Sequence, residues 1–309
     1  MRLLDATATA ELLPFVPLSE EIETTLDRKA LGGVTAPERL NLPLPGGGVL
    51  LVMSAADEDL AVTKLVTVSP GNSSRGLPLI LGEVVVMRAD TGERLGVLDG
   101  PEVTARRTAA ASLLAADLLA PNPRGTLLIV GAGVQALSHA LAFASGLGVT
   151  KIFLCARDRA KADTLARRLE VSGIDATSVA HPEDALEQAT LIVTATNSPS
   201  PVLPTVVRED AFIAAVGSFN PGRAEIPAAL VRRCHLFVDD LEAARSEAGD
   251  LVLAGVNFGE VTPLERVCLA RRSGRVDGAK RGPVLYKAVG HAALDLAAAR
   301  LAFDARLKR

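Results

Sequence analysis

The chain has 309 residues, of which 49% are hydrophobic and 22% charged, and its formal net charge is −3. At about 150 residues per domain this length predicts two domains, and the composition is that of a globular rather than a disordered protein. The sequence has no excess of Lys and Arg, one Tyr and no Trp. It therefore argues against nucleic acid as a partner, because both phosphate neutralisation and base stacking lack the side chains they need.

The sequence also offers no pattern for a metal, a disulfide framework or a membrane segment. Its cysteines, Cys155, Cys234 and Cys268, are far apart and form no cluster with metal-ligand spacing. The N-terminus reaches Asp5 before the apolar core that a signal peptide requires, and no run of about 18 apolar residues is free of charge. We therefore expect a cytoplasmic protein with no metal and no membrane partner.

The first part of the chain mixes helix and strand patterns. Ser19 is predicted to cap a helix that carries Ile22, Leu26 and Ala30 on one face. A second helix is predicted from Gly100-Pro101 to about Leu119, where two prolines follow. Four runs between these helices are typical of strands, and the last two flank a turn at 89–93: Val49–Met53, Leu60–Val68, Leu77–Met87 and Arg94–Leu98.

From residue 120 the pattern alternates short apolar strands with helices, the first of them at Val134–Ser145 and Arg159–Glu170. This alternation predicts an α/β fold with a Rossmann-type doubly wound parallel sheet, here assigned to residues 120–284. A last helix from about Pro283 to Leu307 is predicted to join residues 1–119, so that 1–119 and 285–309 form a smaller α+β domain. The predicted strands are Thr126–Val130, Lys151–Cys155, Asp175–Val179, Leu191–Ala195, Phe212–Val216 and Leu236–Val238.

A glycine-rich loop joins the first strand and helix of the predicted Rossmann-type domain. Gly131 permits a tight turn, Gly133 lets the backbone approach a pyrophosphate, and Ala136 allows close packing of the helix on the strand. The N-terminus of the helix then offers N–H groups to the phosphates. We predict that this G-x-G-x-x-A loop binds a dinucleotide through Gly131, Ala132, Gly133, Val134, Gln135 and Ala136.

The end of the next strand indicates which dinucleotide binds. An NAD site usually places an acidic residue there to hold the ribose 2′-hydroxyl. Ala156 stands in its place and Arg157 follows, and a guanidinium suits a 2′-phosphate. The sequence therefore favours NADP(H) over NAD(H). The alternative is that Arg157 is a solvent-exposed surface residue and that Asp158 caps the following helix.

Basic residues in apolar surroundings suggest a site for an anionic substrate. Lys64 lies within a strand-like run, and Arg106 and Arg107 lie in the first half of the Gly100–Leu119 helix. Cations near a helix N-terminus are unfavourable unless an anion is close by. Arg39 precedes another short strand pattern. The residues alone leave open whether each of these side chains binds a substrate or is a surface cation.

Several segments spread along the chain form a combined pattern: Leu50–Met53, Thr63–Val66, Thr104–Ala110, the Gly131–Ala136 loop, Val216-Gly217-Ser218 with Glu225, and Tyr286–Gly290. In these segments, and over nearly its whole length, the sequence resembles the ornithine cyclodeaminase/mu-crystallin family. The resemblance implies a homodimer formed through the first domain. It also implies that Arg39, Lys64 and Arg107 bind a substrate carboxylate and that the loops 196–198, with Thr196 and Asn197, and 216–218 line the nicotinamide.

One position separates the reactions found in this family. Its cyclodeaminases carry an Asp two positions after the glycine of the Val-Gly segment, where this chain has Phe219. A phenyl ring cannot accept a proton, and loss of general-base assistance typically costs about 10²–10⁴-fold in rate. The resemblance therefore favours the branch that reduces cyclic ketimines, with Phe219 covering the substrate ring.

We accordingly predict an NAD(P)H-dependent reductase that converts Δ1-pyrroline-2-carboxylate or Δ1-piperideine-2-carboxylate to proline or pipecolate. Its partner is a small imino or amino acid, and Lys64 or a water held by the protein donates the proton to the imine nitrogen. Two alternatives stay open at this point. One is ornithine cyclodeaminase with a base recruited from elsewhere, and the other is an NADPH-loaded binding protein without turnover. His291 is a further residue to test near the site.

Overall fold

The computed structural model describes residues 2–273 and 282–307 and divides into two compact units. The first unit comprises Met1–Arg107 and His291–Arg309, and the second comprises Thr108–Gly290. The boundaries predicted from sequence, after residue 119 and before residue 285, differ from these. Helix α3 (Gly100–Leu119) runs from one unit into the other, and a strand before the last helix joins the sheet of the second unit. Among the described residues, no helix combines the length and apolarity that crossing a bilayer requires.

The first unit contains a six-stranded sheet in the order β1-β6-β5-β4-β3-β2. Its strands pair antiparallel except for β1 and β6, which are parallel. The alternation in β4 is clear, because Leu60, Val62, Lys64 and Val66 are buried while the residues between them are more exposed. The strands are β1 (Arg2–Leu3), β2 (Leu40–Leu44), β3 (Gly48–Ala56), β4 (Leu60–Val68), β5 (Ile80–Arg88) and β6 (Arg94–Asp99).

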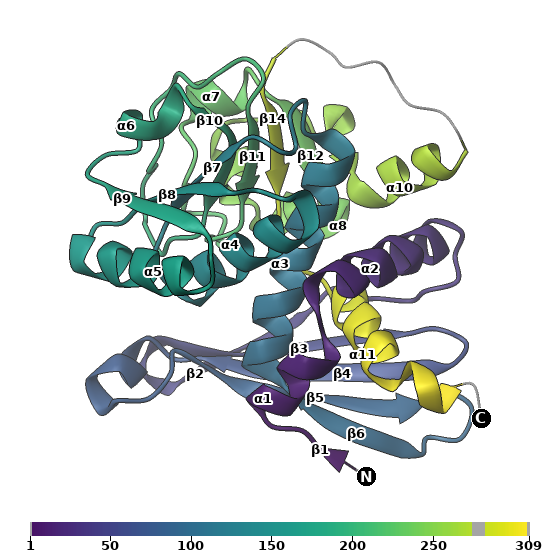
Figure 1. Ribbon diagram of the computed structural model, residues 1–309. Coiled ribbons are helices and arrows are strands. Elements are labelled where there is room, and N and C mark those ends of the chain that lie inside the picture. The colour runs from purple at the N-terminus through teal and green to yellow at the C-terminus, as the bar shows by residue number, and fades with distance from the viewer. Residues whose placement is uncertain (1, 274–281, 308–309) are drawn as a thin grey trace. The chain divides into compact units, whose positions relative to one another are not determined.

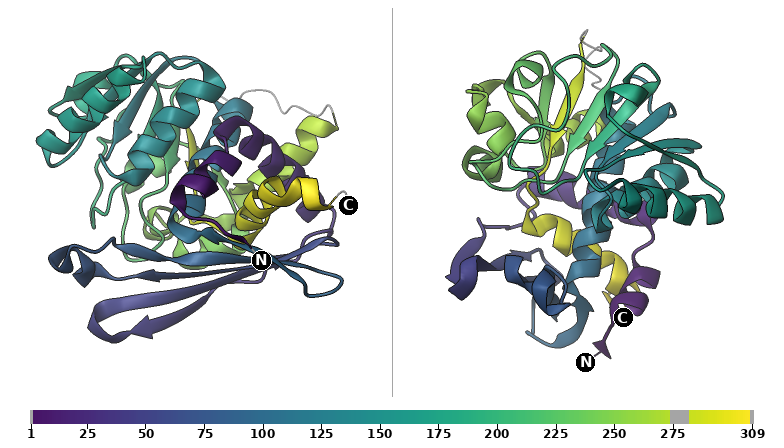
Figure 2. Two further views of the ribbon diagram at one scale, coloured as in Figure 1. Left: turned by 60° about the horizontal axis from the view of Figure 1, so that its bottom comes forward. Right: turned by 90° about the vertical axis from the view of Figure 1, so that its left-hand side faces the viewer.

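Helices α2 (Phe15–Ala30) and α11 (Ala292–Leu307) pack against each other, and α11 contacts β3 and β4 (Figures 1 and 2). A short helix, α1 (Ala6–Leu12), precedes them in the chain. The predicted cap at Ser19 is wrong, because α2 already begins at Phe15 and Ser19 lies buried within it. Pro14 is the N-cap residue and has the extended backbone that this position requires, although it makes no side-chain capping hydrogen bond.

The opposite face of this sheet carries exposed leucines. The cross-strand register aligns Leu40 of β2 with Val52 of β3 and Leu65 of β4, and it aligns Leu42 with Leu50, Thr67 and Leu81 in the next row. We call the four residues Leu40, Leu42, Leu65 and Leu81 the open sheet face; their exposed fractions are 60%, 48%, 39% and 41%. Contiguous apolar surface of this kind is unusual on a protein that stays monomeric.

The second unit is built on an eight-stranded parallel sheet in the order β13-β12-β14-β11-β10-β7-β8-β9. The chain moves outward from β7 to β9 and then returns to place β10 on the other side of β7. This reversal confirms the predicted doubly wound Rossmann-type topology. The strands are β7 (Thr126–Val130), β8 (Lys151–Cys155), β9 (Asp175–Val179), β10 (Ala189–Thr194), β11 (Phe212–Ala215), β12 (His235–Val238), β13 (Thr262–Pro263) and β14 (Val284–Lys287).

Strand β14 corrects the prediction of a single helix from Pro283. Val284–Lys287 forms a fully buried strand between β11 and β12, and the last helix begins only at Ala292. The residues have the β-branched and aromatic character of a central strand. Gly290, with a φ of 81°, lies between the strand and the helix and takes a left-handed conformation. The last helix therefore starts at Ala292, well after the predicted start at about Pro283.

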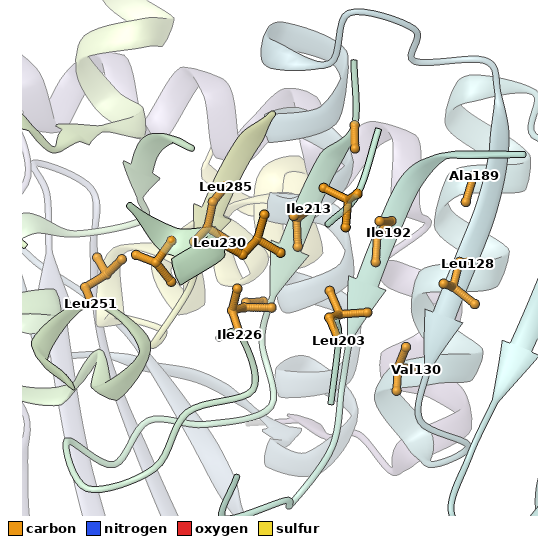
Figure 3. Packing of buried hydrophobic residues seen from close by; sticks show 14 of the residues in the cluster. Leu128, Val130, Ala189, Ile192, Leu203, Ile213, Ile226, Leu230, Leu251 and Leu285 are labelled. Carbon is orange, nitrogen blue, oxygen red and sulfur yellow. The ribbon is translucent and has the colours of Figure 1, made fainter. Parts of the chain in front are cut away.

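Strands β7, β10 and β11 of this sheet are buried on both faces, and one hydrophobic cluster of the second unit lies along one of these faces (Figure 3). Leu128, Ile192, Ile213 and Leu285 come from the neighbouring strands β7, β10, β11 and β14, and all four are fully buried. This packing fixes the strands and hence the loops that leave their carboxyl ends. The helices of the unit are α4 (Val134–Leu147), α5 (Arg159–Val171), α6 (Glu183–Leu186), α7 (Ala228–Val231), α8 (Leu241–Glu247), α9 (Gly249–Leu253) and α10 (Leu264–Arg272).

Candidate active site

The glycine-rich loop lies at the carboxyl end of β7, beside the point where the strand order reverses. Gly131 has a φ of 134°, and a Cβ added there would stand 2.5 Å from the carbonyl oxygen of Ala195. Gly133 is the N-cap of α4, and a Cβ added to it would meet no atom within 4 Å. Ala136 is fully buried against the sheet. The loop is thus closed toward the strand and open at the helix N-terminus, an arrangement that fits a pyrophosphate.

The residues that follow β8 are the predicted determinants of cofactor choice. Ala156 is partly buried, while Arg157 and Asp158 are exposed. Asp158 takes the N-cap position of α5, but its side chain makes no capping hydrogen bond. Arg157 forms no ion pair or hydrogen bond with the residues that the structure describes, so its guanidinium is available to a ligand. Because β8 is adjacent to β7, this strand end is next to the glycine-rich loop.

The loops after β10 and β11 are held together by one carboxylate. Glu225 is fully buried and accepts four hydrogen bonds. The hydroxyl of Thr194 and the backbone N–H of Gly217 donate to Oε2 at 3.1 and 2.7 Å, and the backbone N–H and hydroxyl of Thr196 donate to Oε1, each at 2.8 Å. A Cβ at Gly217 would collide with this carboxylate and with the Thr196 backbone, so the position requires glycine.

Two further buried charges complete what we call the loop-anchoring network, formed by Glu225, Asp250 and Lys287. Asp250 Oδ1 accepts from the backbone N–H groups of Glu225 and Ile226 at 2.6 and 2.8 Å. Lys287 Nζ pairs with Asp250 Oδ2 at 2.9 Å and donates to the carbonyl of Ser218 at 2.6 Å. Burial raises the pKa of Glu225, whereas Lys287 and the donors of Thr196 oppose that rise.

This network positions the segments that the sequence analysis expects to line a nicotinamide, namely Thr196-Asn197 and Val216-Gly217-Ser218. Sequence reasoning noted Glu225 and Lys287 only as parts of family-like motifs and missed Asp250 altogether. The available signal was a charged residue between apolar neighbours, as in Tyr286-Lys287-Ala288. Phe219 follows Ser218 and is 40% exposed, and it belongs to the second unit.

The predicted substrate cations belong to the first unit, where two of them are buried beside one carboxylate. Lys64 of β4 is only 1% exposed and Arg107 of α3 only 5%. Lys64 Nζ lies 2.8 Å from Asp295 Oδ1, and Arg107 Nε lies 3.4 Å from the same oxygen. Arg39, which precedes β2, is partly buried, and its charge acts on Lys64. The structure thus brings Arg39, Lys64 and Arg107 together and adds Asp295, which the sequence analysis missed.

The protonation of Lys64 reflects these neighbours. Burial, together with the positive charges of Arg107 and Arg39, lowers its pKa to about 8, although the ion pair with Asp295 opposes this shift. The group therefore changes charge close to physiological pH. His291, the other residue singled out from sequence, is buried immediately before α11 and lies four residues before Asp295.

Arg106 differs from its neighbour Arg107 in its contacts. Its Nε donates to Glu102 at 2.6 Å, its Nη1 donates to the carbonyl of Leu13 at 3.2 Å, and its guanidinium lies 4.8 Å from the ring centre of Phe15. These contacts tie α3 to the N-terminal helices. The structure thus separates the two adjacent arginines, which the sequence left equivalent until the resemblance was considered.

The parallel sheet and its glycine-rich loop are those of Rossmann-type dinucleotide-binding proteins. The model of the ornithine cyclodeaminase/mu-crystallin family matches residues 2–309, and the chain belongs to this family. It is 42% identical to Delta(1)-pyrroline-2-carboxylate reductase 1 of Burkholderia multivorans, over 99% of this chain and 96% of that one. It is 35% identical to ketimine reductase mu-crystallin of Mus musculus, over 88% and 86%.

A solved structure supports the same relationship. The Delta(1)-pyrroline-2-carboxylate reductase of Thermococcus litoralis, in complex with NADH and L-proline, superposes with a TM-score of 0.92. The match covers 100% of this chain and 98% of that one at 26% identity. The fold predicted from sequence is therefore confirmed over both units.

Replacing Glu225 with Gln tests the loop-anchoring network. The amide retains the size of the carboxylate, but its N–H₂ group would face donors that now bind a carboxylate oxygen. A buried donor without an acceptor costs about 1–3 kcal/mol of folding stability. We expect the free energy of unfolding to fall by about that amount and the dissociation constant for NADPH to rise. Urea denaturation and fluorescence titration measure the two quantities. Glu187→Gln, at an exposed position of the same unit, should change neither; equal behaviour of the two variants would contradict the assignment.

Proposed function

We propose that the protein is an NAD(P)H-dependent reductase of cyclic imino acids, which converts Δ1-pyrroline-2-carboxylate or Δ1-piperideine-2-carboxylate to proline or pipecolate. The observation that carries the proposal is the buried pair of Lys64 and Arg107 on a single carboxylate, with Arg39 close enough for its charge to act on Lys64. Its excess of positive charge suits an anionic substrate. The identity with reductases of Δ1-pyrroline-2-carboxylate over almost the full chain supports the same conclusion.

The side chains supply what imine reduction requires. Arg39 and Arg107 bind the substrate carboxylate, which fixes the neighbouring imine carbon. Lys64, or a water that it holds, donates a proton to the imine nitrogen and makes the carbon a better hydride acceptor. Phe219 covers the apolar part of the ring. It also leaves this position without the carboxylate that a cyclodeaminase would use as a base.

The second unit offers the residues that would hold the cofactor. The loop of Gly131, Ala132, Gly133, Val134, Gln135 and Ala136 would present the helix N-terminus to the pyrophosphate, and Ala156 and Arg157 would hold the adenosine ribose. Thr196, Asn197, Val216, Gly217 and Ser218 would line the nicotinamide, on loops fixed by the loop-anchoring network. When bound, the reduced nicotinamide supplies the hydride.

The activity is tested with purified protein, NADPH or NADH, and each of the two imines. We expect loss of nicotinamide absorbance, and we expect kcat/KM to fall as pH rises through about 8, where Lys64 loses its proton. Lys64→Met should lower kcat/KM by about 10²–10⁴-fold, whereas Lys161→Met, at an exposed position of α5, should leave it unchanged. No turnover of either imine, or formation of proline and ammonia from ornithine with catalytic NAD⁺, would refute the proposal.

We also propose that NADP(H) is the preferred cofactor. Arg157 is exposed beside the glycine-rich loop, and Ala156 stands where an NAD site usually has the acidic residue that binds the ribose. A charge-assisted hydrogen bond to the 2′-phosphate contributes about 1.5–3 kcal/mol, or roughly 10- to 100-fold in affinity. Arg157→Ala should therefore raise KM for NADPH by about that factor and leave KM for NADH unchanged. Arg168→Ala, on the outer surface of the same unit, is the control. A wild-type preference for NADH, or equal effects on both cofactors, would contradict this assignment.

Finally, we propose a homodimer formed through the open sheet face. Leu40 and Leu42 of β2, Leu65 of β4 and Leu81 of β5 form an exposed apolar surface, as expected of an interface that a second copy of the chain covers. Leu65→Glu combined with Leu81→Glu should convert the dimer to a monomer in light scattering after size exclusion. Val171→Glu, at a residue that is 91% exposed, should stay dimeric. A monomeric wild type, or a dimeric double variant, would overturn the proposal.

A further inference from the structure

Asp295 introduces a negative charge into a part of the first unit that is otherwise apolar or cationic. It lies on α11 and is completely buried, with an exposed fraction of 0%. Its neighbours in sequence, Leu294 and Leu296, are buried as well. Across the sheet, Lys64 is paired in register with Met53 and Val84, both apolar. A carboxylate buried in such surroundings is costly unless cations and hydrogen bonds compensate it.

The compensation is asymmetric between the two carboxylate oxygens. Oδ1 accepts a hydrogen bond from Lys64 Nζ at 2.8 Å and forms an ion pair, without a hydrogen bond, with Arg107 Nε at 3.4 Å. Oδ2 is buried and makes no hydrogen bond to the residues that the structure describes. One oxygen therefore connects side chains from β4 and α3 to the C-terminal helix, and the position of each cation depends on the same atom.

We propose that Asp295 is a positioning residue of the active site, which fixes Lys64 and Arg107 on one oxygen and maintains Lys64 in its protonated, proton-donating form. The proposal rests on the proposed function, because it assigns Lys64 the role of proton donor in imine reduction. Asp295 itself contacts the two side chains and takes no part in the chemical step.

The charges that face Lys64 determine the direction of the effect. Asp295 from α11 stabilises the ammonium, whereas Arg107 from α3 and Arg39 from the segment before β2 destabilise it, as does burial. Without Asp295, three cations face one another in a buried site. Removing an opposite charge at this distance lowers the pKa of a lysine by about 1–3 pH units, so the ammonium would be lost near or below neutral pH.

The pH dependence of imine reduction in Asp295→Asn tests this inference. In the pH profile of wild-type kcat/KM we expect a falling limb near pH 8. In Asp295→Asn this limb should lie about 1–3 pH units lower. At pH 8 this corresponds to a loss of about 5- to 500-fold in kcat/KM, with a smaller loss at pH 6. Asp295→Ser is made in parallel, because its smaller side chain leaves room for water if the amide does not pack. Asp295→Glu keeps the charge and should keep the limb within about one pH unit of the wild type.

A matched control separates this role from a structural one. Asp59→Asn removes another ion pair of α11, the one that Arg300 Nη2 makes to Asp59 Oδ2 at 3.0 Å. It should affect stability and leave the limb in place. Ionisation of the imine substrate is common to all variants, so it cannot produce a difference between them. A limb that stays at the wild-type pH in folded Asp295→Asn and Asp295→Ser would overturn the inference while leaving the reductase function intact.

A second measurement does not depend on activity. In protein labelled with ¹⁵N at lysine Nζ, the Lys64 signal is assigned by its absence from Lys64→Met and followed by NMR over pH. It should titrate near pH 8 in the wild type and at lower pH in Asp295→Asn. If the wild type reduces no imine, the proposed function fails, and this titration still decides the inference. Identical titration in both proteins would overturn it.

Discussion

The buried ion pair between Lys64 and Asp295 is the interaction on which the first unit's site depends. An ammonium removed from water and placed near two guanidinium groups would lose its proton unless a carboxylate opposed that loss. The pair joins the central strand β4 to the C-terminal helix α11, residues separated by most of the chain. Folding α11 onto the sheet therefore completes the charge balance of the site as well as its hydrophobic packing.

The second unit uses the same principle for a different purpose. Glu225 and Asp250 are buried carboxylates whose partners are mainly backbone N–H groups and Thr hydroxyls, with Lys287 as the cation. Their hydrogen bonds fix the ends of the loops after β10 and β11. Where Asp295 orients charged side chains, the loop-anchoring network orients backbone, and both depend on acidic residues kept away from solvent.

The sequence predicts those features that local pattern determines. β7, β8 and β9 match their predicted bounds because each is a short strand followed by residues typical of turns or helix starts. The glycine-rich loop is identified by the spacing of its glycines. β14 was predicted as helix, since Val284–Lys287 is an apolar run that either structure could use. Asp295 and Asp250 could not be assigned roles, because their partners lie far away in sequence and only the folded chain shows which cation a buried carboxylate meets. The preference for NADP(H) and the homodimer stay predictions. The first is supported by the exposed Arg157 and the second by the open sheet face.

If the cations around Asp295 bind a carboxylate next to a flat ring, a ligand with that carboxylate should bind far more tightly than the same ring without it. Calorimetric titration with pyrrole-2-carboxylate and with pyrrole, in the presence of saturating NADP⁺, isolates the contribution of that carboxylate from turnover. We expect pyrrole-2-carboxylate to bind to the wild type and to bind far more weakly to Arg107→Met, while pyrrole binds weakly to both. Equal affinity for the two ligands, or no effect of Arg107→Met, would contradict it.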